Sequence, residues 1–152
     1  IHQINLEKGF YNPPASRARR WMLIASELFE AIEGLRENNF NPSLDESRET
    51  IKASCACEMA DAYIRVLDFM EYEGIYAISY RIEDEFIKDP AEEIFSISKL
   101  IHMDGVEIKI LANYVCAKIE RFCQMHKIDL MAFVEWKLAY NLKREYKHGK
   151  EF

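Results

Sequence analysis

The sequence predicts an all-α fold, a bundle of about five to six helices in a single domain that covers residues 1–152. Apolar residues recur with the period of an α-helix through several long stretches. The residues that most often interrupt helices are rare, with five glycines and four prolines in the chain. No stretch has the strict alternation of apolar and polar residues that marks a half-buried strand.

The first long helix is expected over residues 17–37. Ser16 precedes it and is a suitable N-cap, because its hydroxyl can accept a hydrogen bond from a backbone N–H of the first turn. Residues 1–15 end near two consecutive prolines, Pro13 and Pro14, and are expected to form an extended lead-in.

A second long helix is expected over residues 44–72. The preceding segment, residues 38–47, is rich in Asn, Ser, Pro and Asp, which are typical of turns. Within it, Ser43 and Glu46 have the spacing of a capping box. Gly74 is expected to end or kink this helix.

The second half of the chain is expected to contain further helices. Pro90 directly follows Asp89, and proline is typical of the first turn of a helix. Asp104 and Gly105 interrupt the helical pattern again. The expected helical ranges are residues 75–87, 90–102, 106–125 and 130–144.

Two short acidic motifs, each within an apolar helical stretch, point to a metal site. Glu27 and Glu30 are three residues apart, as are Glu58 and Asp61, so each pair shares one helix face. If the two helices pack together, four carboxylates converge, which is costly unless a cation neutralises them. Oxygen ligands of this kind suit a hard divalent ion such as Mg²⁺ or Mn²⁺.

The alternative is that these carboxylates only solvate a helix face, as most charged residues on surface helices do. The surroundings argue against it. Apolar residues such as Trp21, Leu28 and Met59 flank the motifs, and few basic residues lie nearby in the sequence. Two acidic pairs in apolar helices therefore favour a functional site.

The last helix carries a group of polar and basic residues. Lys137, Asn141 and Arg144 are spaced i, i+4 and i+7, which places them on one face, and a basic tail follows. They could bind a phosphorylated ligand. They could also simply complement the dipole at a helix C-terminus. A neighbouring metal site favours the phosphate interpretation, because phosphoryl chemistry uses both metal ions and fixed cations.

Composition excludes several other classes. The net charge of −6 argues against a general nucleic-acid-binding protein. No apolar run approaches the roughly 20 residues that a membrane span requires. The N-terminus has no signal-peptide pattern, and the four cysteines have no metal-binding spacing, so we expect a cytoplasmic protein with buried thiols and no zinc site.

Taken together, these motifs resemble the MazG-like, all-α nucleoside triphosphate pyrophosphohydrolases. The resemblance covers residues 8–37, 50–70 and 128–150. The segment of residues 75–115 is longer than the corresponding region of compact family members. It is expected to be an extended or inserted helical segment. One departure is Ser26, which stands where the family often has an additional glutamate before the first motif.

The resemblance implies Mg²⁺-dependent hydrolysis of a nucleoside triphosphate at the α–β bond, giving the monophosphate and pyrophosphate. It implies that Glu27, Glu30, Glu58 and Asp61 are metal ligands, and that Glu27 or Glu30 is also catalytic as the general base. Lys137, Asn141 and Arg144 would bind the substrate. The resemblance further implies a homodimer or homotetramer and a role in removing unwanted nucleotides, with a pyrimidine deoxynucleotide as the preferred expectation.

Two other functions are considered. A ferritin-like di-iron bundle also uses carboxylates on facing helices, but it needs Glu-x-x-His pairs, which this sequence lacks. A non-catalytic helical protein that senses nucleotides or interacts with partners would keep the fold without turnover. The complete set of four acidic residues favours the enzyme.

Overall fold

The computed structural model describes residues 1–7, 15–80, 82–83, 87–103 and 105–143, and these residues form helices and loops with no β-strand. The all-α prediction is therefore confirmed for this part of the chain. In chain order the helices are α1 His2–Glu7, α2 Arg17–Arg36, α3 Arg48–Lys52, α4 Cys55–Tyr72, α5 Pro90–Ile101, α6 Ile108–Met125 and α7 Leu130–Leu142.

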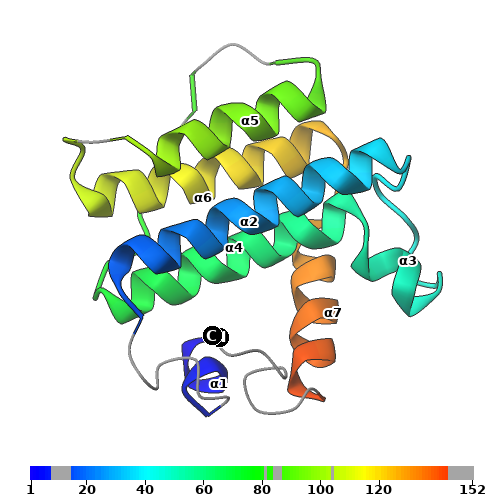
Figure 1. Cartoon of the computed structure of the whole chain (residues 1–152), viewed down its shortest axis with the longest axis horizontal. Helices are drawn as coiled ribbons and strands as arrows, with labels where there is room; N and C mark the ends of the chain where they lie inside the picture. The colour runs from blue at the N-terminus through cyan, green and yellow to red at the C-terminus, as the bar shows by residue number, and fades with distance from the viewer. Residues whose placement is uncertain (8–14, 81, 84–86, 104, 144–152) are drawn as a thin grey trace.

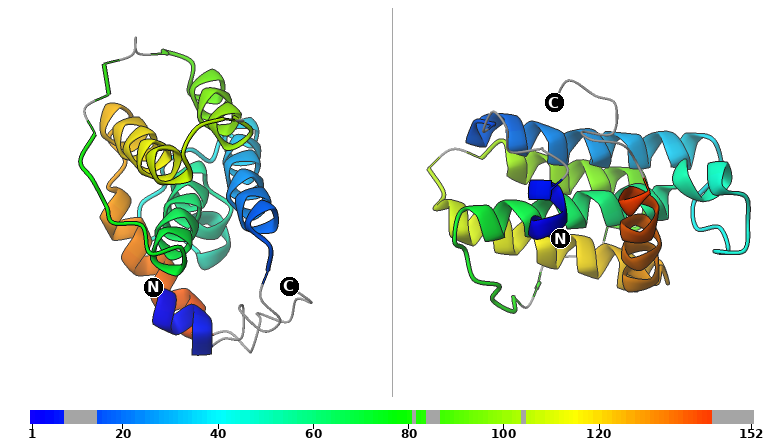
Figure 2. Two further views of the ribbon diagram at one scale, coloured as in Figure 1. Left: turned by 90° about the vertical axis from the view of Figure 1, so that its left-hand side faces the viewer. Right: turned by 90° about the horizontal axis from the view of Figure 1, so that it is seen from below.

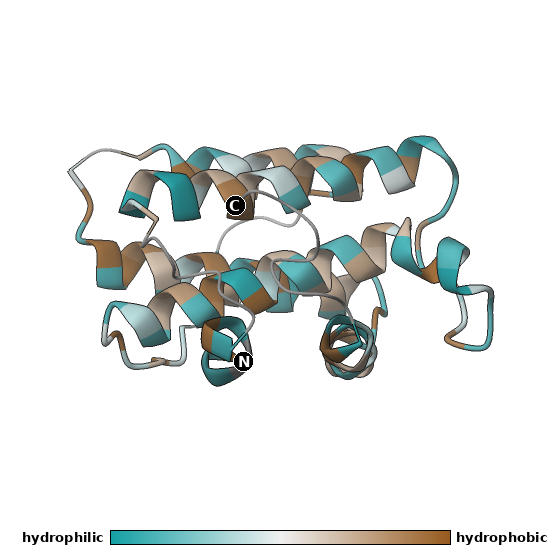
Figure 3. Ribbon diagram, turned by 60° about the horizontal axis from the view of Figure 1, so that its bottom comes forward, coloured by the Kyte–Doolittle hydropathy of each residue, from teal (hydrophilic) through white to brown (hydrophobic). Residues whose placement is uncertain are grey.

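Helices α2, α4, α5 and α6 lie side by side with their long axes roughly aligned, and α7 crosses α4 at a steep angle (Figure 1). The end view in Figure 2 shows these four helices surrounding a common centre, with α1 and α7 on the side of α4. Figure 3 shows that each long helix carries both apolar and polar residues. The apolar faces meet in one core, whose largest fully buried side chains include Phe69, Phe122, Ile24, Leu28 and Met59.

Serine and aspartate side chains set where most of the long helices begin. The Ser16 hydroxyl accepts a hydrogen bond from the backbone N–H of Arg19, and Asp89 caps α5 in the same way with proline at its first position. Asp129 caps α7 through the N–H of Ala132. The predicted cap at Ser16 and the predicted helix start at Pro90 are confirmed.

The helix expected over residues 44–72 is instead two helices, α3 and α4, separated by a break at Ala53 and Ser54. Ser54 causes the break, because its hydroxyl donates to the carbonyl of Ile51 at 2.7 Å and accepts from the N–H of Cys57 at 3.1 Å. Helix α3 is capped by Ser47, so the expected cap at Ser43 was wrong.

Two further segments differ from the expectation. Residues 2–7 form helix α1 within the range expected to be extended. Residues 75–80 are not helical, because Gly74 at φ +67° ends α4 and Asn113 on α6 then binds the extended chain. The Asn113 side chain accepts from the N–H of Ile78 at 2.6 Å and donates to the carbonyl of Tyr76 at 3.1 Å.

Among the described residues, none of the helices is both long and apolar enough to cross a membrane.

Helix α2 closely approaches the start of α4 at Gly34. A Cβ atom at this position would lie 2.5 Å from the backbone nitrogen of Cys55 and 3.0 Å from the carbonyl oxygen of Ala53. Just beyond α2, the carbonyls of Asn39 and Phe40 accept from the N–H groups of the first residues of α4, at 3.0 and 2.9 Å. Gly34 thus sets how the two helices are aligned.

Replacing Gly34 with alanine should lower the free energy of unfolding by about 1–3 kcal/mol, since the new methyl group meets backbone atoms that cannot turn away. Chemical denaturation measures this. The matched control is Glu33→Ala on the exposed side of the same turn, which should change stability little. Equal stability of the Gly34→Ala protein and the original would contradict the close approach.

Candidate metal centre

Three of the four predicted acidic ligands come together between α2 and α4. Glu27, Glu58 and Asp61 each place one carboxylate oxygen within 4.8 Å of the others, and both glutamates are buried. The helices run in opposite directions (Figure 1), so the first motif on α2 lies opposite the second on α4. We call these three residues the acidic cluster.

The fourth predicted ligand, Glu30, lies at the edge of this arrangement. It is exposed one turn after Glu27 and is not one of the three residues of the acidic cluster. Its negative charge nevertheless contributes to a raised pKa at Glu58, so the two carboxylates are close enough to influence each other. Glu30 could therefore act from the solvent side of the cluster.

Two cations contact the acidic cluster, although the sequence near the motifs suggested few basic partners. Arg65 on α4 donates from Nε to Oε1 of Glu27 at 2.5 Å. Lys137 on α7 places its Nζ 2.5 Å from Oδ2 of Asp61 and 4.0 Å from Oε2 of Glu58. Lys137, predicted to bind substrate, is thus buried against the acids, with only 3% of its side chain exposed.

Glu58 lies in an environment that disfavours its charged form. Its Oε2 atom is buried and has no hydrogen-bond partner. Burial raises the pKa of this carboxyl to about 9, and the charges of Asp61, Glu27 and Glu30 act in the same direction, against the attraction of Lys137. Burial also raises the pKa of Asp61, again against Lys137. The charged form of Glu58 therefore lacks sufficient compensation in the protein alone.

This donor set fits a hard divalent cation. Three convergent carboxylates match the oxygen ligands of Mg²⁺ or Mn²⁺, and the unpartnered Oε2 atom of Glu58 is a ligand atom without a protein donor. No cysteine or histidine belongs to the cluster. The four cysteines are free and buried, as expected, and burial raises the pKa of Cys57, beside Lys137, to about 12.

Of the remaining predicted substrate ligands, the structure describes Asn141, which lies further along α7. Asn141 is one turn beyond Lys137 and half-buried, and its side-chain oxygen is buried without a hydrogen-bond partner. Arg144 lies outside the described residues.

No family model, curated protein or solved structure matches this chain. What the site can do is therefore inferred from its own side chains.

The stability of the metal-free protein should depend on pH through Glu58. Its pKa is about 9 in the folded protein against an ordinary value of 4.5, so between these values the folded state keeps a proton that the unfolded state has lost. This contribution therefore falls as pH rises from about 4.5 to about 9. Melting temperatures of the original protein and Glu58→Gln across this range measure it.

Glu58→Gln should flatten this dependence because the amide does not titrate. Exposed Glu33 offers the matched control, and Glu33→Gln should keep the slope of the original protein. An unchanged slope in Glu58→Gln would show that Glu58 is already ionised in the folded protein.

Lys137 occupies the position that a bound cation would compete for. Lys137→Met should therefore tighten Mn²⁺ binding to the nucleotide-free protein, by roughly tenfold, because one positive charge leaves the cluster. Isothermal titration calorimetry at fixed pH and ionic strength measures the change. Lys109→Met, on the exposed surface of α6, is the control. Weaker Mn²⁺ binding in Lys137→Met would instead mean that the lysine organises the carboxylates.

Proposed function

We propose that this chain is a Mg²⁺-dependent nucleoside triphosphate pyrophosphohydrolase that cleaves the α–β bond and releases pyrophosphate. The observation that carries the proposal is the meeting of Glu27, Glu58 and Asp61 from two facing helices, with a buried Glu58 oxygen that lacks a partner. Such a cluster is poorly stable alone and suits an ion that also binds phosphate oxygens.

The resemblance to the MazG-like family is part of this proposal. It is supported by the placement of the two acidic motifs on adjacent antiparallel helices of an all-α bundle, with Lys137 of the late motif against them. The pairing of an acidic motif on each of two helices with a lysine on a third is a more specific arrangement than any one motif alone.

In this mechanism Glu27, Glu58 and Asp61 would hold the divalent ion, and Glu30 would complete the site from its exposed edge. The bound ion would neutralise phosphate charge and lower the pKa of an attacking water. A carboxylate of the first motif, Glu27 or Glu30, accepts the proton of that water. Arg65 orients Glu27 through its hydrogen bond and stays positive, because the charges of Glu27 and Asp61 raise its pKa against the effect of burial.

The substrate phosphates would be met by α7. Burial opposes the charged form of Lys137, but Asp61 and Glu58 raise its pKa, so it remains an ammonium group. With the carboxylates engaged in holding a divalent ion, this ammonium would be available to the phosphates. Asn141 offers hydrogen bonds one turn away, and Arg144 is proposed to add a further positive charge.

The substrate is proposed to be a deoxynucleoside triphosphate, preferably with a pyrimidine base, and the role to be removal of unwanted nucleotides. A homodimer or homotetramer is proposed as the working form. Met22 and Phe29 lie seven residues apart on one face of α2 and are 67% and 49% exposed, which supports burial of this face against a second copy.

A non-catalytic nucleotide-sensing protein is the second candidate. The observation that favours it is the contact of Lys137 with Asp61 at 2.5 Å, because a lysine can neutralise an acidic cluster permanently. The enzyme is the stronger candidate because one ammonium group contacts Asp61 well but leaves the Glu58 oxygen without a hydrogen bond.

Pyrophosphate release from a panel of nucleoside triphosphates, with and without Mg²⁺, tests the proposal. Glu27→Gln, Glu58→Gln and Asp61→Asn should each lower turnover by about two orders of magnitude or more, since each removes an anionic ligand. Glu30→Gln should lower turnover as much if Glu30 is the general base, and less if Glu30 only assists the metal ligands. Glu33→Gln is the control, on an exposed position of the same helix.

Full activity of the Glu58 or Asp61 variant would contradict the proposed metal ligands. Tight nucleotide binding without any pyrophosphate release would favour the sensing protein.

A further inference from the structure

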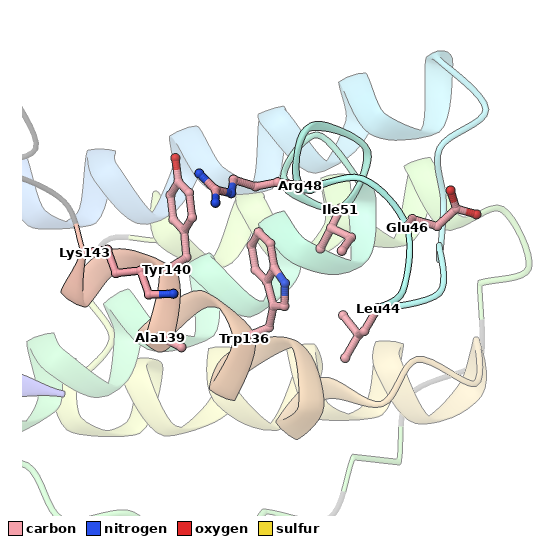
Figure 4. Close-up of a pocket in the computed structure, with 8 residues that line it drawn as sticks. All are labelled: Leu44, Glu46, Arg48, Ile51, Trp136, Ala139, Tyr140 and Lys143. Atoms are coloured by element: carbon pink, nitrogen blue, oxygen red, sulfur yellow. The ribbon is translucent and has the colours of Figure 1, made fainter.

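A second candidate site lies between α7 and the segment that leads into α3. It is an open pocket of about 420 Å³, within the range of about 300–1,000 Å³ typical of small-molecule sites. Its walls combine aromatic, charged and aliphatic side chains (Figure 4): Leu44, Glu46, Arg48, Ile51, Trp136, Ala139, Tyr140 and Lys143.

Two aromatic rings on α7 form a flat wall of this pocket. Trp136 and Tyr140 are one helical turn apart, and their rings are nearly parallel, at 4° with centroids 5.5 Å apart. Arg48 extends from α3 toward Tyr140 (Figure 4), with its guanidinium carbon 5.9 Å from the ring centroid. The pocket thus offers parallel aromatic surfaces next to a fixed positive charge.

These features define a ligand class. A flat aromatic ring can stack on the Trp136–Tyr140 pair, and such stacking accepts any nucleobase because every base has a π face. Arg48 and Lys143 favour a ligand that also carries negative charge, and both belong to the pocket lining. A nucleotide has both properties, whereas a purely apolar ligand would leave the two cations unused.

The pocket and the acidic cluster share helix α7. Trp136 directly precedes Lys137 and Tyr140 directly precedes Asn141, so the aromatic pair and the polar pair lie about 100° apart around the same two turns. Lys137 faces the acidic cluster, and Trp136 faces the pocket. The pocket and the acidic cluster therefore lie at neighbouring faces of the same two turns of α7.

We propose that the pocket between α3 and α7 binds the nucleobase of the nucleotide whose phosphates reach the acidic cluster. This inference rests on the proposed function and adds to it the position of the base. Stacking on Trp136 and Tyr140 holds the ring, and Arg48 and Lys143 lie beside it in the pocket lining. Recognition by stacking predicts binding of several bases with modest differences among them.

The test compares nucleotides with a ligand that has phosphates but no base. The probes are the α,β-imido analogues of dUTP, dCTP, dATP and dGTP, and inorganic triphosphate, each titrated with Mg²⁺ by calorimetry. Trp136→Ala should weaken binding of at least one analogue by roughly 5- to 140-fold and leave triphosphate binding unchanged. Trp136→Phe should restore most of the affinity, because it keeps an aromatic ring.

Fluorescence gives a second measurement. The chain has two tryptophans, so Trp21→Phe leaves Trp136 as the only one, and the nucleotide analogues should quench its emission while triphosphate should not. Met131→Ala is the control for general effects on α7, since Met131 is 55% exposed and is not part of the pocket lining.

The outcomes separate this inference from the proposed function. Normal kcat/KM and analogue affinity in Trp136→Ala would overturn the base pocket while leaving the hydrolase intact. Equal weakening of analogue and triphosphate binding, or absence of quenching, would also overturn it. Quenching and base-dependent binding without pyrophosphate release would support the pocket and reject the hydrolase.

Discussion

The close antiparallel contact between α2 and α4 is the constraint on which the rest of the structure depends. Gly34 lets the backbone of α2 approach the start of α4, and the carbonyls of Asn39 and Phe40 satisfy N–H groups there that have no partner within the helix. This fixes the alignment of the helices along their length. Glu27 and the pair Glu58–Asp61 therefore face each other about one to two turns from the contact. Burying these carboxylates between the helices costs free energy that apolar side chains of similar volume would not cost.

That cost is only partly offset by the protein itself. Arg65 and Lys137 contact two of the three carboxylates, and the third, Glu58, keeps a buried oxygen without a donor. A structural ion-pair network would normally satisfy every buried polar atom, because each unsatisfied one lowers stability. The incomplete satisfaction of Glu58 is the observation that favours a bound cation here over a network that only stabilises the fold.

Much of the fold could be predicted from local sequence signals. Apolar periodicity, the cap at Ser16 and the proline at position 90 placed α2, α5, α6 and α7 within a few residues. The break at Ser54 could not be predicted, because the apolar pattern continues across it and the competing hydrogen bonds form only in the folded chain. At the site, the position of Arg65 near the acids was predictable, because Arg65 follows Asp61 by four residues and so shares its helix face. Arg65 was nevertheless not among the predicted site residues. The direction of Lys137 had no such signal, since it depends on how α7 crosses α4.

The crossing of α7 over α4 also explains why one short helix can serve two chemically different surfaces. A helix that lies parallel to its neighbour buries one stripe along its whole length, whereas a steeply crossing helix buries only the turns near the crossing point. Leu130, Phe133, Val134 and Lys137 make the buried face of α7, which leaves Trp136 and Tyr140 to line the adjacent pocket. Lys137 is the only ionisable residue on that buried face, and it is placed where α7 meets the acids of α4.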